Sequence, residues 1–285
     1  MKNTKKFTIA LLFGFLGIVL FSCNNKNDPA PEESPSQILA SVSWQTTGAR
    51  NEKGENVELT NENVIPTVGY AYFKSNGTFT IFSLDDAPRI QGDWSVTADG
   101  KTRTITAKNA AGGTLFTRDV EIIVLTRQEF TYRIYPNEND RSVYLDIIHT
   151  PTTHVEPTFT FTPSQILASV SWETTSAKNN QGATVPLTNP NVINFVGYAY
   201  FKTNGSFIMV NLDDSPKLQG TWSVSADGKT RTLVALNDDN EVLFTRVVDI
   251  TVLTTTEFTY RIYPNNNDRT VYFDIVHTPT DHVEP

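Results

Sequence analysis

Cysteine is nearly absent from this chain, because Cys23 is the only one among its 285 residues. No disulfide can therefore form within the chain, although small exported domains often depend on such bonds. Histidine is also scarce: all four histidines lie in two related segments, HTPTTHVEP at residues 149–157 and HTPTDHVEP at residues 277–285. Two histidines and a glutamate would suit zinc, but a proline interrupts each segment at a strand end, where no ordered ligand frame is expected. We expect no metal, and we assign these histidines to packing or capping at strand ends.

Sequence patterns of nucleophilic catalysis are missing too. The serines lie in predicted strands or turns, and none stands in a Gly-x-Ser-x-Gly elbow. Adjacent carboxylates occur at Asp85-Asp86 and Asp213-Asp214, but the proline two residues after each pair is typical of turns. We therefore expect a protein that is not an enzyme and that has no cofactor.

No apolar run reaches the roughly 20 residues that a membrane-spanning helix needs. The apolar stretch FTIALLFGFLGIVLF at residues 7–21 follows three lysines and precedes a cysteine, an order typical of a secretory signal. The sequence LFSC resembles the lipobox of bacterial lipoproteins, in which the thiol of Cys23 would accept a diacylglycerol. We predict a signal peptide at residues 1–22 and a membrane anchor through a lipid on Cys23.

Residues 23–35 are polar and contain several prolines, a composition that cannot bury enough apolar surface to fold, so we expect a flexible tether. Asn24 stands where an aspartate would resemble an inner-membrane retention signal, and NNKND resembles the export signals of surface lipoproteins in Bacteroides-like bacteria. We expect the protein at the outer membrane or the cell surface. Removal of residues 1–22 leaves 20 basic and 31 acidic residues, a net charge of -11, which argues against a nucleic-acid partner.

A gapless internal duplication fills the rest of the chain. With a shift of 128 residues, 82 of the 122 positions from Ser36 to Pro157 are identical to their partners in the second copy. A repeat of this length has the size of a complete small domain, not of a solenoid unit. We expect two domains, at residues 36–157 and 163–285, joined by residues 158–162.

Short β-rich runs alternate with turn sequences in each copy, and Asn76-Gly77 is typical of a tight hairpin. A capped helical turn at residues 36–40 is expected before the first strand. The eight strands expected in the first copy span residues 42–49, 68–74, 78–84, 89–96, 101–107, 114–125, 129–135 and 141–149.

Short connections make consecutive strands antiparallel neighbours. A meander of eight strands has two open edges unless it closes on itself. The sequence therefore predicts an all-β protein of two tandem eight-stranded antiparallel up-and-down barrels, with a two-sheet sandwich as the alternative. Alternation along the strands gives the residues expected to face the interior: Phe79, Ile81, Ile90, Trp94, Val96, Ile105, Phe116, Val120, Ile122, Val124, Phe130, Tyr132, Ile134, Val143, Leu145 and Ile147.

The order of these motifs resembles that of a known group of proteins. YAYFKSNGTF, GDWSVTADGKTRT, EFTYRIYP and YLDIIHTP follow one another as in the lipocalin-like domains of lipoproteins from Bacteroides and related bacteria, some of which belong to families of unknown function. The resemblance covers residues 36–150 and 164–278. It implies two lipocalin-like barrels on a lipid-anchored protein.

Arg118 and Arg246, at equivalent positions, are the first candidates for a binding site. In FTRDVEIIV, alternation turns Arg118 into the barrel. Because burial of an unpaired charge is very costly, its guanidinium needs an acidic side chain, a carbonyl group, water or an anionic ligand. The alternative is an arginine at the barrel mouth that reaches solvent or stacks on Trp44. Further candidates combine an apolar body with a polar tip, and core packing is their alternative role: Trp94, Tyr132, Trp222 and Tyr260.

The interior of an eight-stranded barrel holds either packed side chains or one small ligand. We therefore expect non-enzymatic binding of a small apolar or amphipathic ligand. The alternative is a surface interaction protein with filled barrels, which binds a glycan or another protein through its loops. An exposed patch of Tyr70, Tyr72 or Tyr135 would favour that alternative.

Overall fold

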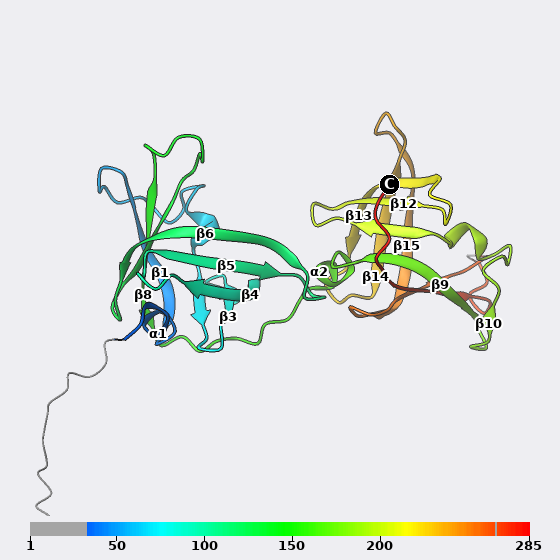
Figure 1. The fold of residues 1–285 in the computed structure, drawn as a ribbon. Coiled ribbons are helices and arrows are strands. Elements are labelled where there is room, and N and C mark those ends of the chain that lie inside the picture. The colour runs from blue at the N-terminus through cyan, green and yellow to red at the C-terminus, as the bar shows by residue number, and fades with distance from the viewer. Residues whose placement is uncertain (1–32, 266) are drawn as a thin grey trace, which may run out of the picture. The chain divides into compact units, whose positions relative to one another are not determined.

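The computed structural model describes residues 33–265 and 267–285 (Figure 1). The predicted signal peptide, Cys23 and the tether up to residue 32 lie outside the described residues. In the part of the chain that is described, no helix has both the length and the apolar character needed to cross a membrane.

The first copy is a closed barrel, in which each strand pairs antiparallel with the next and the last strand returns to the first. Closure comes from β8, whose register against β1 runs from Thr152 opposite Ser43 to Leu145 opposite Asn51. The elements are α1 (Pro35–Leu39), β1 (Ser43–Asn51), η1 (Ile65–Thr67), β2 (Tyr70–Phe73), β3 (Thr78–Phe82), β4 (Pro88–Val96), β5 (Thr102–Lys108), β6 (Thr114–Leu125), β7 (Phe130–Ile134) and β8 (Leu145–Thr152).

The second copy repeats this barrel and closes through the pairing of β9 with β17. The short strand β10 pairs only with β9, at Ala177 and Lys178, beyond the residues of β9 that pair with β11. Both copies confirm the predicted fold and exclude the sandwich. The elements are α2 (Pro163–Leu167), β9 (Ser171–Asn179), β10 (Thr184–Val185), η2 (Ile193–Phe195), β11 (Tyr198–Phe201), β12 (Ser206–Val210), β13 (Pro216–Val224), β14 (Thr230–Leu236), β15 (Val242–Leu253), β16 (Phe258–Ile262) and β17 (Phe273–Thr280).

Each barrel begins with a short helix that leads into the core. The helix α1 starts two residues earlier than predicted, because its N-cap is Ser34 and not Ser36; Ser34 forms a capping box with Gln37. At its other end Leu39 is fully buried, and the carbonyl oxygen of Leu39 accepts a hydrogen bond of 2.8 Å from Nε1 of Trp44 on β1. The helix therefore covers one end of the barrel core.

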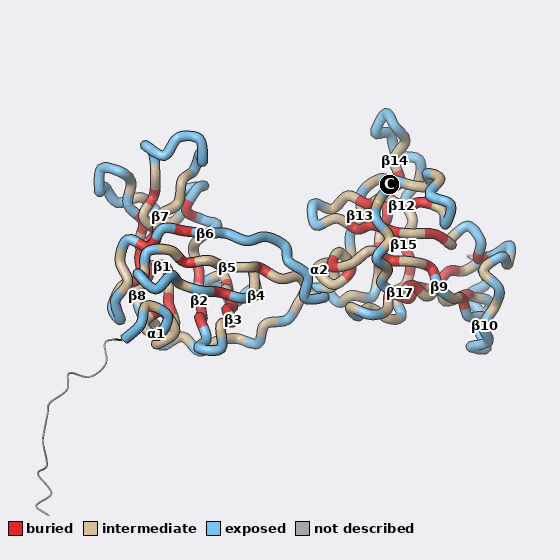
Figure 2. The backbone as a smooth tube through the Cα atoms, viewed as in Figure 1, coloured by how far each residue is buried: buried red, intermediate tan, exposed pale blue. Residues whose placement is uncertain are grey.

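The core lies inside the barrel, as the buried positions along the strands show (Figure 2). Two of the expected interior residues are wrong. The bulge in β6 between Ile122 and Val124 shifts the alternation, so that Leu125 and not Val124 packs against the core. Val143 is exposed because β8 begins only at Leu145. The other expected residues belong to the core or pack against it, except Phe116, which lies at the barrel mouth and is 37% exposed.

Residues 153–159, which follow β8, cross the outer face of β2 and β3 and are called the strap below. The hydroxyl of Tyr72 and Nδ1 of His154 are 2.6 Å apart. Phe82 packs edge-on against Phe159 of the strap, with ring centroids 5.6 Å apart. The strap therefore buries Tyr72 and Phe82, two aromatic side chains that point away from the barrel interior.

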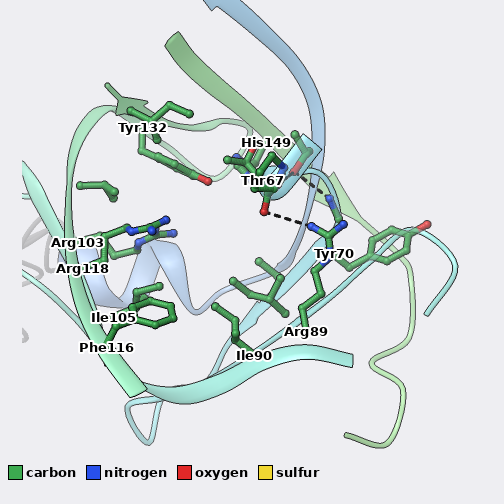
Figure 3. Close-up of a pocket in the computed structure, with 17 residues that line it drawn as sticks. Thr67, Tyr70, Arg89, Ile90, Arg103, Ile105, Phe116, Arg118, Tyr132 and His149 are labelled. Atoms are coloured by element: carbon green, nitrogen blue, oxygen red, sulfur yellow. Dashed lines mark hydrogen bonds between the residues drawn. The ribbon is translucent and has the colours of Figure 1, made fainter. Parts of the chain in front are cut away.

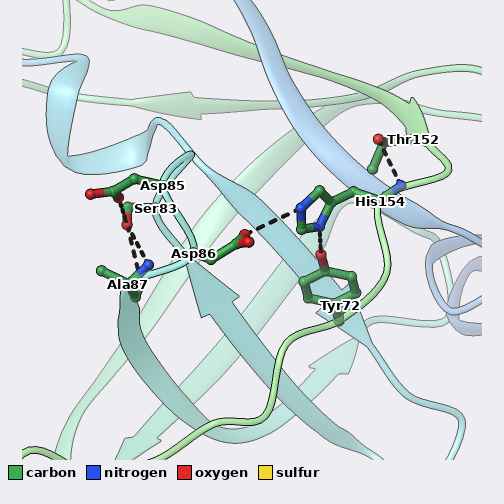
Figure 4. A network of polar contacts seen from close by, with 7 residues as sticks. All are labelled: Tyr72, Ser83, Asp85, Asp86, Ala87, Thr152 and His154. Atoms are coloured by element: carbon green, nitrogen blue, oxygen red, sulfur yellow. Dashed lines mark hydrogen bonds and ion pairs between the residues drawn. The ribbon is translucent and has the colours of Figure 1, made fainter.

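Charged groups hold the strap in place (Figure 4). Nε2 of His154 lies 3.2 Å from Asp86. Glu156 accepts a hydrogen bond of 2.6 Å from the hydroxyl of Thr80 and forms an ion pair of 2.8 Å with Lys74. The second copy repeats the arrangement with Tyr200, Asp214 and His282, and with Lys202 and Glu284. The second histidine of each motif therefore fastens the segment after the last strand, which is the strap in the first copy and residues 281–285 in the second.

The first histidine of each motif is a core residue. His149 on β8 is buried, and its Nε2 lies 3.0 Å from the hydroxyl of Thr46 on β1. Burial, together with the nearby charge of Arg103, lowers the pKa of His149 to about 3. The pKa of His277 is lowered to about 3 for the same reasons, with Arg231 as the nearby charge. Both imidazoles are therefore neutral at neutral pH.

The free energy of unfolding should decrease as the pH is lowered. An unfolded histidine binds a proton near pH 6.5, whereas folded His149 does so only near pH 3. The contribution of His149 to the free energy of unfolding is therefore complete above about pH 6.5 and is lost as the pH falls towards 3. Between about pH 5.5 and 4, His149→Asn should reduce the slope of unfolding free energy against pH by about 1.4 kcal/mol per pH unit, the effect of one proton. Urea titrations at several pH values measure this slope, and an unchanged slope would contradict the neutral state of His149.

Candidate functional site

The interior of the first barrel contains a cavity of about 230 Å³ between the core and the barrel mouth (Figure 3). Strands from all around the barrel contribute to its wall, and so does the loop that contains η1. The residues that line it are Thr46, Pro66, Thr67, Gly69, Tyr70, Ala71, Ile81, Arg89, Ile90, Arg103, Ile105, Phe116, Arg118, Val120, Tyr132, Ile134 and His149.

Arg103 on β5 forms the inner part of the wall and is only 5% exposed. Its guanidinium carbon lies 4.6 Å from the ring centroid of Tyr132, and 5.5 Å and 5.6 Å from those of Phe130 and Phe73. Nε of Arg103 has no hydrogen-bond partner among the described residues. Burial lowers the pKa of Arg103, since no carboxylate forms an ion pair with it in the described part of the chain. Arg103 is a buried cation among aromatic rings, with the hydroxyl of Tyr132 and the charge of Arg118 nearby.

Two further arginines line the same cavity nearer its mouth. Arg118 on β6 is exposed, and its guanidinium carbon lies 5.4 Å from the ring centroid of Phe116. Nη1 of Arg89 donates to the carbonyl oxygen of Pro66 over 3.2 Å. No aspartate or glutamate is among the residues that line the cavity. The electrostatic potential inside is therefore positive.

The uncharged polar groups of the wall supply hydrogen bonds without adding charge. Burial raises the pKa of Tyr132, so its hydroxyl keeps its proton and can donate. The hydroxyl of Thr46 donates to the carbonyl oxygen of Thr67 over 2.7 Å, and the hydroxyl of Thr67 donates to Val64 over the same distance. His149 is neutral. Because both threonine hydroxyls already donate to backbone carbonyl oxygens, a bound anion would meet the cations and the hydroxyl of Tyr132 as a neutral donor.

The second barrel keeps the charged and aromatic groups of this site but almost none of its space. Its cavity measures about 30 Å³. Arg231, Arg246, Tyr260 and His277 take the positions of Arg103, Arg118, Tyr132 and His149, and Lys217 takes that of Arg89.

Two substitutions fill the interior of the second barrel. Phe195 stands at the position of Thr67, and Met209 at that of Ile81. The ring of Phe195 lies edge-on to Tyr260 at 6.4 Å, and 5.1 Å from the guanidinium carbon of Arg246. A phenyl ring therefore occupies the space that is open in the first barrel.

The structure brings together four of the six residues predicted for ligand binding. Arg118 and Tyr132 line the first cavity, and Arg246 and Tyr260 line the second. Arg118 reaches the barrel mouth and contacts Phe116, not Trp44.

The two predicted tryptophans do not line these cavities. Nε1 of Trp94 donates to the carbonyl oxygen of Lys74 over 3.0 Å, and its ring packs edge-on to Phe73 at 5.3 Å. Trp222 makes the equivalent contacts with Lys202 and Phe201. Both tryptophans therefore pack in the core, which was the alternative to a role in ligand binding.

The sequence interpretation missed Arg103 and its counterpart Arg231. The signal was present, because Arg103 alternates in phase with Ile105 and Ala107 along β5, as Arg118 does with Val120 along β6. The difference between Thr67 and Phe195 was also visible between the copies. Neither residue lies in a strand, so no alternation assigned them to the interior.

Across residues 33–265 and 267–285, no group of three or more histidine, cysteine, aspartate or glutamate side chains is arranged to hold a metal ion. The cavity is lined instead by cations, neutral donors and apolar groups. Its chemistry suits recognition of a molecule and offers no set of metal ligands.

Comparisons with known proteins bear on the family and not on the ligand. A lipocalin-like protein from Bacteroides uniformis is 14% identical, with a TM-score of 0.28, over 40% of this chain and 99% of its own. A protein of unknown function from the DUF3598 family of Nostoc punctiforme is 8% identical, with a TM-score of 0.19, over 87% of this chain and 100% of its own. No curated protein matches the chain.

The duplication is confirmed at the level of the family. The model of a domain of unknown function, DUF4822, matches the chain twice, over residues 36–159 and 164–285. These matches cover nearly all of both barrels. The chain belongs to the DUF4822 family and carries two tandem copies of its domain.

Proposed function

We propose that this protein is a non-enzymatic binding protein and that its N-terminal barrel holds one small organic molecule. The observation that carries the proposal is the cavity of about 230 Å³ in that barrel, beside about 30 Å³ in its own duplicate. An apolar cavity of about 150 Å³ in another protein suffices for benzene. The N-terminal cavity therefore has room for a molecule slightly larger than benzene.

The C-terminal barrel serves as a filled counterpart in this proposal. It keeps the equivalents of Arg103, Arg118, Tyr132 and His149, but Phe195 and Met209 stand where Thr67 and Ile81 line the first cavity. A volume of about 30 Å³ corresponds to roughly one water molecule. One ligand per chain is therefore expected.

The alternative function, recognition of a glycan or protein by loop tyrosines, receives less support. Tyr72 is buried under the strap, and Tyr70 stacks on His154 with ring centroids 3.9 Å apart. The hydroxyl of Tyr135 contacts Glu121 at 3.2 Å. These tyrosines do not form an exposed patch.

The array of Asp86, His154 and Tyr72 has the order of a catalytic triad but not its chemistry. Burial raises the pKa of Tyr72 to about 12, which is the opposite of what activates a nucleophile. The three residues lie outside the barrel interior and fasten the strap (Figure 4). This arrangement supports a structural role and a protein that is not an enzyme.

The proposal places the protein at the outer membrane or the cell surface, anchored by a lipid on Cys23. Its support is the basic, apolar and LFSC order of residues 2–23, and the polar segment that follows. The barrels would then stand outside the cytoplasm, where a ligand can reach them without crossing the inner membrane.

An exchange of one residue between the copies should move the binding capacity. Thr67→Phe should close the N-terminal cavity and reduce binding by at least about tenfold, because a ligand cannot share the space with a phenyl ring. Phe195→Thr should open the C-terminal barrel and add a second site. Saturation-transfer NMR on the mature protein measures binding of three probes: benzamide, benzoate and hexanoate.

Circular dichroism and thermal melting serve as the folding control for both variants. If Thr67→Phe is folded and binds every probe as the parent does, the site is elsewhere. If none of the three probes binds to the parent protein, the proposed function is wrong.

Anchoring through Cys23 has a separate test. The protein expressed in a Gram-negative host should partition into the detergent phase of Triton X-114, because two or more acyl chains give stable membrane attachment. Cys23→Ser should move it to the aqueous phase with its barrels folded. Detergent-phase partition of the Cys23→Ser variant would contradict a lipid on this sulfur.

A further inference from the structure

We infer that the ligand of the N-terminal cavity is a small organic carboxylate, whose anionic group meets Arg103 and Arg118 and whose apolar body packs against the isoleucines of the wall. This inference rests on the proposed function and names the class of its ligand. It follows from the buried charge, the lining and the second copy.

The buried charge of Arg103 lacks a counter-ion. Its guanidinium faces the rings of Phe73, Phe130 and Tyr132, which offset only part of the cost of burying a cation. Nε is without a hydrogen-bond partner in the described part of the chain, and the side chain faces the cavity (Figure 3). An anion in the cavity would supply the missing charge and would accept hydrogen bonds from the accessible part of the guanidinium, although Nε itself is buried.

The remaining polar groups of the cavity agree with an anion. Arg118 and Arg89 approach from the mouth, and Tyr132 offers a neutral hydroxyl donor. No aspartate or glutamate lines the cavity, so no charged side chain of the lining repels an anion. Charges of one sign in a cleft also raise the rate of entry of an oppositely charged ligand.

The rest of the lining requires an apolar body on the same ligand. Ile81, Ile90, Ile105, Val120 and Ile134 line the cavity, and they cannot replace the hydration shell of a bare inorganic anion. A volume of about 230 Å³ exceeds the roughly 150 Å³ that holds benzene. The difference leaves room for a carboxylate group.

The second copy shows how an apolar group fits this space. Phe195 places its ring 5.1 Å from the guanidinium carbon of Arg246, the counterpart of Arg118. It also lies edge-on to Tyr260, the counterpart of Tyr132. A phenyl ring is therefore compatible with the geometry beside these arginines, and the ligand of the first barrel would take the place that Phe195 takes in the second.

Benzoate and benzamide test whether the cavity prefers an anion, because the two molecules have nearly the same shape and differ by one negative charge. Isothermal titration of the mature protein should give an affinity for benzoate about tenfold to a hundredfold higher than for benzamide, the usual effect of hydrogen bonds to a charged group. Hexanoate separates an aliphatic from an aromatic carboxylate. Sodium sulfate tests whether an anion that lacks an apolar body is bound. It should bind at least about tenfold more weakly than benzoate.

Matched variants assign the effect to one barrel. Arg103→Met should remove the preference for benzoate over benzamide, whereas Arg231→Met at the equivalent position of the filled barrel should leave it unchanged. Arg118→Gln, at the exposed mouth, gives a second variant if Arg103→Met does not fold, and it should reduce the preference.

The outcomes separate this inference from the proposed function. If benzoate and benzamide bind with equal affinity, or if sulfate binds as tightly as benzoate, the ligand is not a small organic carboxylate. The proposal that the N-terminal barrel binds a small molecule is then unaffected. A preference for benzoate that survives both Arg103→Met and Arg118→Gln overturns the carboxylate inference as well. If no probe binds to the parent protein, both the function and the inference are wrong.

Discussion

The pairing of the last strand with the first in each copy is the constraint on which the rest depends. Eight of the residues between Ser43 and Asn51 have partners on β8, and this pairing turns a meander into a barrel with an inside. Closure satisfies the backbone groups of both edges without a disulfide. It also directs arginine, tyrosine and histidine side chains from separate strands to one shared space.

The two copies show how little is needed to change what such an interior can do. The scaffold, the buried arginine and the neutral histidine are the same in both, and the strap is fastened by the same residue types. The cavity of about 230 Å³ in the first barrel shrinks to about 30 Å³ in the second, where Phe195 and Met209 stand at the positions of Thr67 and Ile81. One copy thus contains a cavity, whereas its duplicate is nearly filled.

Most of the fold could be predicted from the sequence, because strand alternation and hairpin turns are local signals. Val124 was misassigned because a bulge is set by pairing with β7, and a single strand does not reveal it. Arg118 and Tyr132 were found by alternation, and Arg103 could have been found in the same way. The cavity volume could not, since it depends on how Thr67 of η1, outside any strand, lies against β1 at the cavity wall. The strap was missed because its contacts join residues far apart in the sequence.

The central claim is that the N-terminal barrel is hollow and cationic inside whereas the C-terminal barrel is full. A crystal of the protein grown with 4-bromobenzoate tests it most directly through the anomalous signal of bromine. The account predicts one bromine site per chain, in the N-terminal barrel, with carboxylate oxygens within about 3 Å of Arg103 or Arg118. Bromine in the C-terminal barrel, or in neither barrel, would contradict it.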